Sequence, residues 1–506
     1  MKKFLYTLLA LLLIGLLTTY LILFTEWGNK IIASYIEKKI NPNERYLSVK
    51  TFKLRFNSLD FESQANDDST LILKGDFSLL KQSVNLNYHI DIKNLRSFKD
   101  LIPYPLRGAI VTSGNIKGHR KALIIQGVSN VAQSHTAYNA LLDDFKLSHL
   151  SLNAKDANLE DLLYLINHPA YANAKVSLQA DFNSLKPLEG HLTLTANNAL
   201  INQMFHLNLK DTLVFNLSHS SDFKGNKAIS DTTLTSPLAN FKALKSEYLF
   251  SVLKLNAPYT LEIPNLAKFY NITNHPLKGS LTLKGTIEQS PKLLKVSGHS
   301  NLLDGVLDFT LLNKDLKARF SNISTLKALD LFHYPKFFQS VADANLDYDL
   351  IAKQGVLKAR LKNARFLKNA FSDFLYSISK FDITKEIYND ANLISQINQQ
   401  RLLSDLSLKS PKTQLKIHNG LLDLSTKQMD MLMDAEILKF IFKMKLQGNM
   451  HQPKFSLILN EKAIQQNLQQ GLKEILKNDT LKKGLDHLFK DDKLKEKLEK
   501  GLKGLF

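Results

Sequence analysis

Alternation of apolar and polar residues dominates this chain of 506 residues from Tyr46 onward. A period of two is typical of strands that have one apolar and one polar face. Turn-forming Asn, Asp, Gly and Ser recur every 8–12 residues or so, as hairpins require. We therefore expect a mainly β fold with short helices, in which an elongated, curved antiparallel sheet of roughly 25 strands forms a repeating β-groove. The alternation is clearest in residues 84–88, 192–195, 281–284 and 357–362.

An internal repeat supports an elongated body. Residues 92–116 match residues 263–287 without gaps, and the pair includes Pro-Leu-Arg-Gly at 105–108 and Pro-Leu-Lys-Gly at 276–279. Each copy predicts a strand, a short helix, a turn that contains Pro, and a second strand. Such repeats contact mainly their neighbours and build extended bodies. Weaker copies occur at 159–169 and 326–335.

The N-terminus carries a long apolar run. Residues 4–24 contain no charge and follow Lys2 and Lys3. A helix of this length spans roughly 31 Å, which matches a hydrocarbon core of about 30 Å. We predict a transmembrane anchor over residues 1–25; the alternative is a cleaved signal peptide, whose apolar core is shorter and ends in small residues. The side chains that we expect within the bilayer include Phe4, Leu12, Leu17 and Phe24.

The two lysines predict the orientation of the anchor. Positively charged residues stay on the cytoplasmic side, so the N-terminus is expected there and the body on the far side. In a bacterium this describes a single-pass protein of the inner membrane with a periplasmic body, and the alternative is a eukaryotic protein with a luminal body.

The remaining chain divides by its periodicity. We expect a juxtamembrane helix over 26–42, a repetitive β-groove body over 43–365 and a helical interlude over 366–400. C-terminal closing strands follow over 401–460, and an amphipathic Lys/Leu helical tail over 461–506. Apolar residues at helical spacing predict two helices in the interlude, one near Phe371 and Leu375 and one over 387–397. Two roles remain open for the tail, membrane-surface binding and a cap on the sheet.

The net charge of +19, from 66 basic and 47 acidic residues, has an ordinary interpretation. Lysines and arginines occupy polar positions of alternating strands, as at Lys358, Arg360 and Lys362. No basic run interleaved with aromatic residues indicates a nucleic-acid site, so we expect no nucleic-acid partner. Attraction to anionic lipid headgroups is the functional interpretation that suits a membrane-anchored body.

Catalytic motifs are absent from the sequence. The chain has no Cys and no phosphate-binding, zinc-protease or serine-hydrolase signature. His168 and His275 precede prolines in predicted turns, and Asp143 and Asp144 are adjacent, which suits a turn better than acid–base chemistry. We expect a protein that is not an enzyme and that needs no metal or cofactor.

The predicted strands present more apolar surface than the few helices can cover. Either sheets cover one another, or lipid covers the wall. Carrying a two-chain lipid through water exposes roughly 30 methylenes at about 0.8 kcal/mol each, more than 20 kcal/mol in total. An apolar trough removes most of that cost. The candidate groove residues are Leu192, Leu194, Leu281, Leu283, Leu357, Leu361, Leu415, Ile417, Leu422 and Leu424.

The C-terminal half carries a pattern found in a known family. Residues 341–350 form an alternating strand, 406–411 end in Ser-Pro, 419–424 read Asn-Gly-Leu-Leu-Asp-Leu, and 446–455 close with Gly-x-x-x-x-Pro-x-Phe. This order resembles the AsmA-like family of inner-membrane-anchored bacterial proteins. The resemblance implies a bridge-like lipid transfer protein with a hydrophobic groove, which moves phospholipid to the outer membrane or supports outer-membrane biogenesis.

We therefore expect a protein that carries phospholipid acyl chains in a β-groove. About 25 strands at ~4.7 Å reach only about 120 Å, which implies an envelope protein partner or an oligomer. The alternative is a non-enzymatic structural or assembly factor for outer-membrane proteins or the envelope. An envelope hydrolase, which would need a compact pocket with a His or carboxylate pair, is a third hypothesis.

Overall fold

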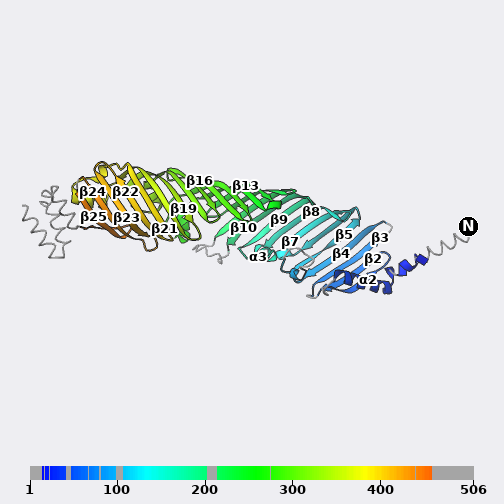
Figure 1. The fold of residues 1–506 in the computed structure, drawn as a ribbon. Coiled ribbons are helices and arrows are strands. Elements are labelled where there is room, and N and C mark those ends of the chain that lie inside the picture. The colour runs from blue at the N-terminus through cyan, green and yellow to red at the C-terminus, as the bar shows by residue number, and fades with distance from the viewer. Residues whose placement is uncertain are drawn as a thin grey trace, which may run out of the picture. The chain divides into compact units, whose positions relative to one another are not determined.

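The computed structural model describes residues 14–15, 17–21, 23–41, 47–65, 68–78, 81–98, 106–201, 213–273, 275–438 and 440–458. The chain forms two compact units, Met1–Glu262 and Ile263–Phe506. The described residues are mainly β, with 26 strands and a few short helices (Figure 1). The predicted fold class, mainly β with short helices, is confirmed at this level.

In unit 1 each strand pairs antiparallel with the next along the chain. The helices are α2 (Glu26–Ile40), η1 (Leu95–Phe98), η2 (Val131–Gln133), α3 (Leu159–Leu165) and η4 (Phe250–Val252). The strands are β1 (Leu47–Leu54), β2 (Ser58–Ala65), β3 (Thr70–Ser78), β4 (Ser83–Ile92), β5 (Ile110–His119), β6 (Ala122–Ser129), β7 (His135–Asp143), β8 (Lys146–Asn158), β9 (Ala172–Leu185), β10 (Leu188–Ile201), β11 (Val214–Lys224), β12 (Lys227–Thr235), β13 (Asn240–Leu249) and β14 (Lys254–Ile263).

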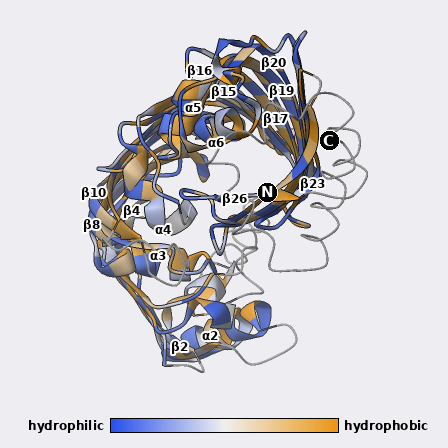
Figure 2. Ribbon diagram, turned by 90° about the vertical axis from the view of Figure 1, so that its left-hand side faces the viewer, coloured by the Kyte–Doolittle hydropathy of each residue, from blue (hydrophilic) through white to orange (hydrophobic). Residues whose placement is uncertain are grey.

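Unit 2 continues with the same meander order. Its helices are η5 (Leu266–Phe269), α4 (Tyr270–Thr273), α5 (Thr325–Leu331), α6 (Ala370–Ser379) and η6 (Ile383–Lys385). Its strands are β15 (Leu281–Ser290), β16 (Leu293–Leu302), β17 (Gly305–Leu312), β18 (Asp315–Ser324), β19 (Phe338–Asp349), β20 (Gln354–Phe366), β21 (Asp390–Asn398), β22 (Arg401–Lys409), β23 (Thr413–Asp423), β24 (Gln428–Ile437), β25 (Phe440–Asn449) and β26 (Lys454–Ile458). Apolar and polar residues alternate along the strands, as the colours of Figure 2 show.

A recurring β-bulge interrupts the alternation. In β23 the buried residues change from Leu415 and Ile417 to Gly420, because His418 and Asn419 are both exposed. Asn419 has a positive φ of 49°, and its backbone N–H donates to the Asp405 carboxylate at 2.9 Å. Such bulges bend a strand and strengthen its twist. Equivalent bonds join Asn198 to Asn216, Lys245 to Asp231, and Asn322 to Asp343.

The turns along one edge of unit 2 are linked to one another. The first residue after a strand donates its backbone N–H to a carbonyl of the preceding turn, as Leu350 does to Lys314 at 2.9 Å. The same bond joins Gln399 to Lys353 at 2.7 Å and Leu424 to Gln400 at 2.8 Å. These bonds satisfy backbone groups outside the strand ladder, so the edge is held by a continuous chain of contacts.

The repeat predicted from the sequence is confirmed by its hydrogen bonds. In unit 1 the Leu95 N–H donates to the Gly108 carbonyl at 2.8 Å, and the Arg107 N–H donates to Leu165 at the end of α3. In unit 2 the equivalent bonds join Leu266 to Gly279 and Lys278 to Leu331 at the end of α5, each at 2.9 Å. Each unit therefore contains one copy of the same module.

Helices α2 and α6 confirm two predicted helices. The prediction of a second helix in the interlude, over 387–397, is wrong. Residues 390–398 form β21, where Ala391 and Ser395 are buried and Ile394 is 44% exposed on the opposite face. The helical spacing predicted over 387–397 depended on Ile394, which is apolar but lies on the outer face of the strand. This one residue obscured the period of two. Leu393 and Ile397 complete the inner face of this strand.

The predicted anchor lies largely outside the described residues, which exclude Phe4 and Leu12. Leu17 and Phe24 are described, both in helical segments, and Leu17 is 60% exposed. Within the described part of the chain, no helix has both the length and the apolar character that a membrane crossing requires. The predicted amphipathic tail, residues 461–506, also lies outside the described residues.

Candidate functional site: the apolar inner wall

Each unit has one sheet face on which buried side chains gather and short helices pack, and we call this face the inner wall. Alternation separates it from the outer face. On β15, Leu281 and Leu283 are half-buried, whereas Thr282 and Lys284 are exposed. Gly285 lies two residues after Leu283 and therefore on the same face of β15. Residues paired across the neighbouring strands connect Gly285 to Leu357, so Leu283 and Leu357 lie on the same wall.

Cross-strand rows in unit 2 show what this wall consists of. Two rows of paired residues cross strands β15–β20 on this wall, and their side chains are apolar. Most of them are half-buried, whereas Ala318 in one of these rows is buried. Their neighbours on the same strands, such as Lys317 and Lys358, are exposed on the outer face. One row runs through Gly285, Gly298, Phe309, Ala318, Leu346 and Leu357, and the next through Ile287, Val296, Leu311, Leu316 and Tyr348.

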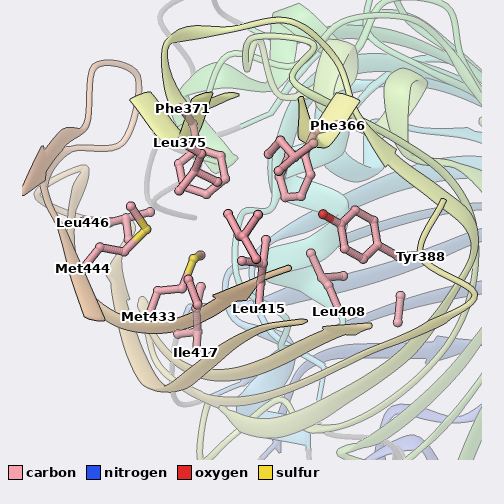
Figure 3. Packing of buried hydrophobic residues seen from close by; sticks show 14 of the residues in the cluster. Phe366, Phe371, Leu375, Tyr388, Leu408, Leu415, Ile417, Met433, Met444 and Leu446 are labelled. Carbon is pink, nitrogen blue, oxygen red and sulfur yellow. The ribbon is translucent and has the colours of Figure 1, made fainter. Parts of the chain in front are cut away.

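The end of unit 2 is filled by protein instead. Helix α6 begins at the N-cap Asn369, whose side chain accepts from Phe371 and Ser372, and it places Phe371 and Leu375 over the strands. Figure 3 shows these residues, together with Phe366 and Tyr388, inside the bend of the sheet. The other fully buried members of this core are Ala364, Ile383, Ala391, Leu408, Leu415, Ala435, Ile437 and Met444.

The candidate groove residues of unit 2 thus fall into two environments. Leu281, Leu283 and Leu357 are half-buried on the part of the wall outside the α6 core. Leu361, Leu415 and Ile417 belong to the α6 core, and Leu422 packs against it. Leu424 is half-buried directly after β23.

In unit 1 the two candidates also differ in their surroundings. Leu194 packs with Leu159 and Leu162 of α3 against a small core that contains Val176. Leu192, two residues earlier on β10, is half-buried and faces Ala180 and Ser221 on the neighbouring strands.

A polar cluster that was not predicted from the sequence pattern interrupts the wall of unit 1. The Nδ1 atom of His219 lies 2.8 Å from the Thr232 hydroxyl, and its Nε2 atom lies 2.8 Å from the Ser221 hydroxyl. Ser221 also contacts the Ser230 hydroxyl at 2.7 Å. Burial lowers the pKa of His219, which favours the neutral imidazole. The period of two places Leu217, His219 and Ser221 on the same face of the strand, and this spacing could have indicated polar side chains on the wall.

A second polar pair lies over glycines of the same wall. The register aligns Tyr88, Gly114, Gly127 and Tyr138 across four neighbouring strands. The two tyrosine hydroxyls form a short hydrogen bond above the glycines, where a Cβ at either glycine would lie within 2.5 Å of the Tyr88 hydroxyl. Desolvation raises the pKa of Tyr88 above its ordinary value. These positions therefore require glycine for steric reasons.

The outer face carries the charge that the composition indicates. Lys443 pairs with Asp434 at 3.1 Å, and Lys74 pairs with Asp60 at 3.4 Å, each across neighbouring strands. Lys362 pairs in the same way with Asp343, whose pKa it lowers. These side chains are about half-exposed, so the pairs contribute little to stability, and they match the sheet surface that the sequence predicts.

The side chains considered for chemistry lie in turns. Asp144 pairs with Arg120, and its backbone N–H donates to the Arg120 carbonyl at 3.0 Å. His168 donates its backbone N–H to Leu163 in the turn after α3. Among the described residues, no group of three or more His, Cys, Asp or Glu could hold a metal ion.

Comparison with known proteins adds no relative to this description. No protein-family model, no curated protein and no solved structure matches the chain.

Proposed function

We propose that this chain is an anchored, non-enzymatic protein that carries phospholipid acyl chains along the inner wall. The observation that supports the proposal is the incomplete burial of the wall side chains on β15–β20, among them Leu283, Phe309 and Leu357, which are half-buried. A protein core of this size would normally bury such residues. A bound acyl chain would remove this apolar surface from water, which lowers the free energy by about 25 cal/mol for each Å² that is buried.

The proposal includes the cellular setting. The uncharged run of residues 4–24 would anchor the chain in a bacterial inner membrane, with a cytoplasmic N-terminus and a periplasmic body. The resemblance of residues 341–455 to the AsmA-like family supports lipid delivery toward the outer membrane, with an envelope protein or further copies of the chain as partners. The phospholipid headgroup would remain in water, because the wall on β15–β20 is apolar.

Site-specific photo-cross-linking tests this function. The photoreactive residue p-benzoylphenylalanine is introduced at Leu283 or Leu357 on the inner wall, and at the outer-face neighbours Lys284 or Lys358 as matched controls. After irradiation in living cells that contain radiolabelled phospholipid, we expect labelled adducts at the two inner positions only. Equal labelling at all four positions, or none at the inner ones, would reject the lipid groove. Adducts with an outer-membrane protein at the inner positions would instead support the assembly-factor alternative.

A further inference from the structure

The exposed face of helix α2 is unusually apolar for a water-facing surface. Trp27, Ile31 and Tyr35 are 66%, 45% and 63% exposed. They recur at intervals of four residues and therefore form one stripe along the helix. Lys30 and Lys38 flank the stripe and are also exposed. Large apolar and aromatic side chains in this arrangement are typical of a binding surface.

The opposite face of α2 is fixed to the sheet. The side chain of Asn29 makes hydrogen bonds to both backbone polar groups of Leu54, and Asn41 does the same with Leu47. The Glu37 carboxylate accepts from the Val49 N–H at 2.6 Å. Because β1 is the first strand of unit 1, these bonds cover its open edge. They also hold the helix in one rotation, so the apolar stripe points away from β1.

Further aromatic residues lie beside this helix. Phe56, in the turn between β1 and β2, is 60% exposed and contacts Phe24 edge-on, with ring centroids 5.9 Å apart. Thr25 is the N-cap of α2, and its hydroxyl accepts from the Gly28 N–H. The uncharged run of residues 4–24 therefore ends directly where α2 begins.

We propose that α2 lies in the headgroup region of a lipid bilayer, with Trp27, Ile31, Tyr35 and Phe56 inserted at the boundary of the acyl chains. Trp and Tyr are enriched at this depth of a membrane, and lysines beside an apolar stripe pair with lipid phosphates. Continuity with a run long enough to cross a bilayer favours lipid over a protein as the occupant. The bonds to β1 would then hold the first edge of the sheet at the membrane surface.

This inference shares with the proposed function only the membrane location, and it does not depend on lipid carriage. Trp27 is the one tryptophan of the chain, so its fluorescence reports on the stripe directly. The full-length protein is reconstituted into vesicles of anionic phospholipid, with or without lipids brominated near the carbonyl end of the acyl chains. We expect brominated lipid to quench the Trp27 emission, because tryptophan at the headgroup level lies close to bromines near the carbonyl end of the acyl chains, and we expect aqueous iodide to have little effect.

A double variant, Trp27→Phe with Phe145→Trp, is the matched control. Phe145 lies in the turn between β7 and β8 and is also 66% exposed, so its replacement should respond to iodide and not to brominated lipid. Iodide quenching of Trp27 would overturn the inference, because the stripe would face water. Shielding from both quenchers would overturn it in favour of a protein partner or a second copy. Equal quenching of both tryptophans by brominated lipid would indicate unspecific adsorption and would also overturn it. Cross-linking at Leu283 is scored separately, so either proposal can fail without the other.

Discussion

The side chain of Asn29 replaces a missing neighbouring strand for Leu54. Its Oδ1 atom accepts from the Leu54 N–H at 3.0 Å, and its Nδ2 donates to the Leu54 carbonyl at 3.2 Å. Asn29 is only 7% exposed, so these bonds are largely shielded from water. Helix α2 thus satisfies these backbone groups at the edge of β1 without adding another strand, whose own outer edge would again be open.

Replacing this asparagine should open the edge locally. We expect Asn29→Ala to weaken the α2–β1 contact by about 1–3 kcal/mol, because two hydrogen bonds are lost and the Leu54 groups stay partly buried. Hydrogen exchange of the Leu54 amide should accelerate accordingly. Ser34→Ala, on the exposed side of the same helix, is the control and should leave this amide unchanged. If the Leu54 amide exchanged at the same rate in Asn29→Ala, the side chain would not be what protects the edge.

The bulge at Asn419 gives a second prediction. A β-branched residue is strained at positive φ, at a cost of about 1–3 kcal/mol, so Asn419→Val should lower the melting temperature of the protein. Asn345→Val is the matched control, because Asn345 is exposed in the regular part of β19 and valine suits a strand. Asn419→Gly should stay close to the original protein. A melting temperature that is equally lowered in Asn345→Val would mean that backbone strain at the bulge is not the cause.

The two environments of the wall predict opposite effects of one substitution. Leu415 is fully buried in the α6 core, so Leu415→Asp should destabilise the protein by several kcal/mol, because burial of an unpaired carboxylate is costly. Leu283 is only half-buried, and Leu283→Asp should reduce phospholipid transfer between vesicles while the melting temperature changes little. Normal transfer in Leu283→Asp together with a large loss of stability would mean that Leu283 is part of an ordinary protein core.

Periodicity was sufficient to predict most of this fold. Every alternating segment singled out in the sequence is a strand, and the Pro-Leu-Arg-Gly and Pro-Leu-Lys-Gly sequences that end at Gly108 and Gly279 mark equivalent hydrogen bonds. The inward position of Leu422 was also predicted, although it depends on a bulge that the sequence pattern does not reveal. The bulge becomes visible only when Asn419 is found at positive φ with the Asp405 carboxylate on the neighbouring strand.

The polar cluster around His219 and the α6 core were harder to predict, and for a common reason. Both depend on contacts between residues that are distant in sequence. His219 reads as an ordinary polar residue until register places Thr232 opposite it. Leu361 and Leu415 have the same alternation as Leu283, and only the position of α6 separates covered from half-buried wall. Pattern therefore predicts which face a side chain occupies, but not what covers it.

The carboxylate of Asp423 predicts how stability depends on pH. It accepts hydrogen bonds from the Ser425 hydroxyl and the Thr426 N–H, and it pairs with Arg401 at 3.2 Å. The Ser425 hydroxyl first, and then these other contacts, lower the pKa of Asp423 to about 2. An unfolded aspartate titrates near 3.9, so the stabilisation is present above about pH 4 and is lost as the pH falls toward 2.

Other carboxylates titrate in the same range, so the measurement is the difference between the original protein and Asp423→Asn. The variant should melt at a lower temperature near neutral pH, and the gap should narrow as the pH falls from about 4 toward 2, where the folded carboxylate becomes protonated. A gap that stayed constant across this range would show that the charge of Asp423 does not stabilise the turn after β23.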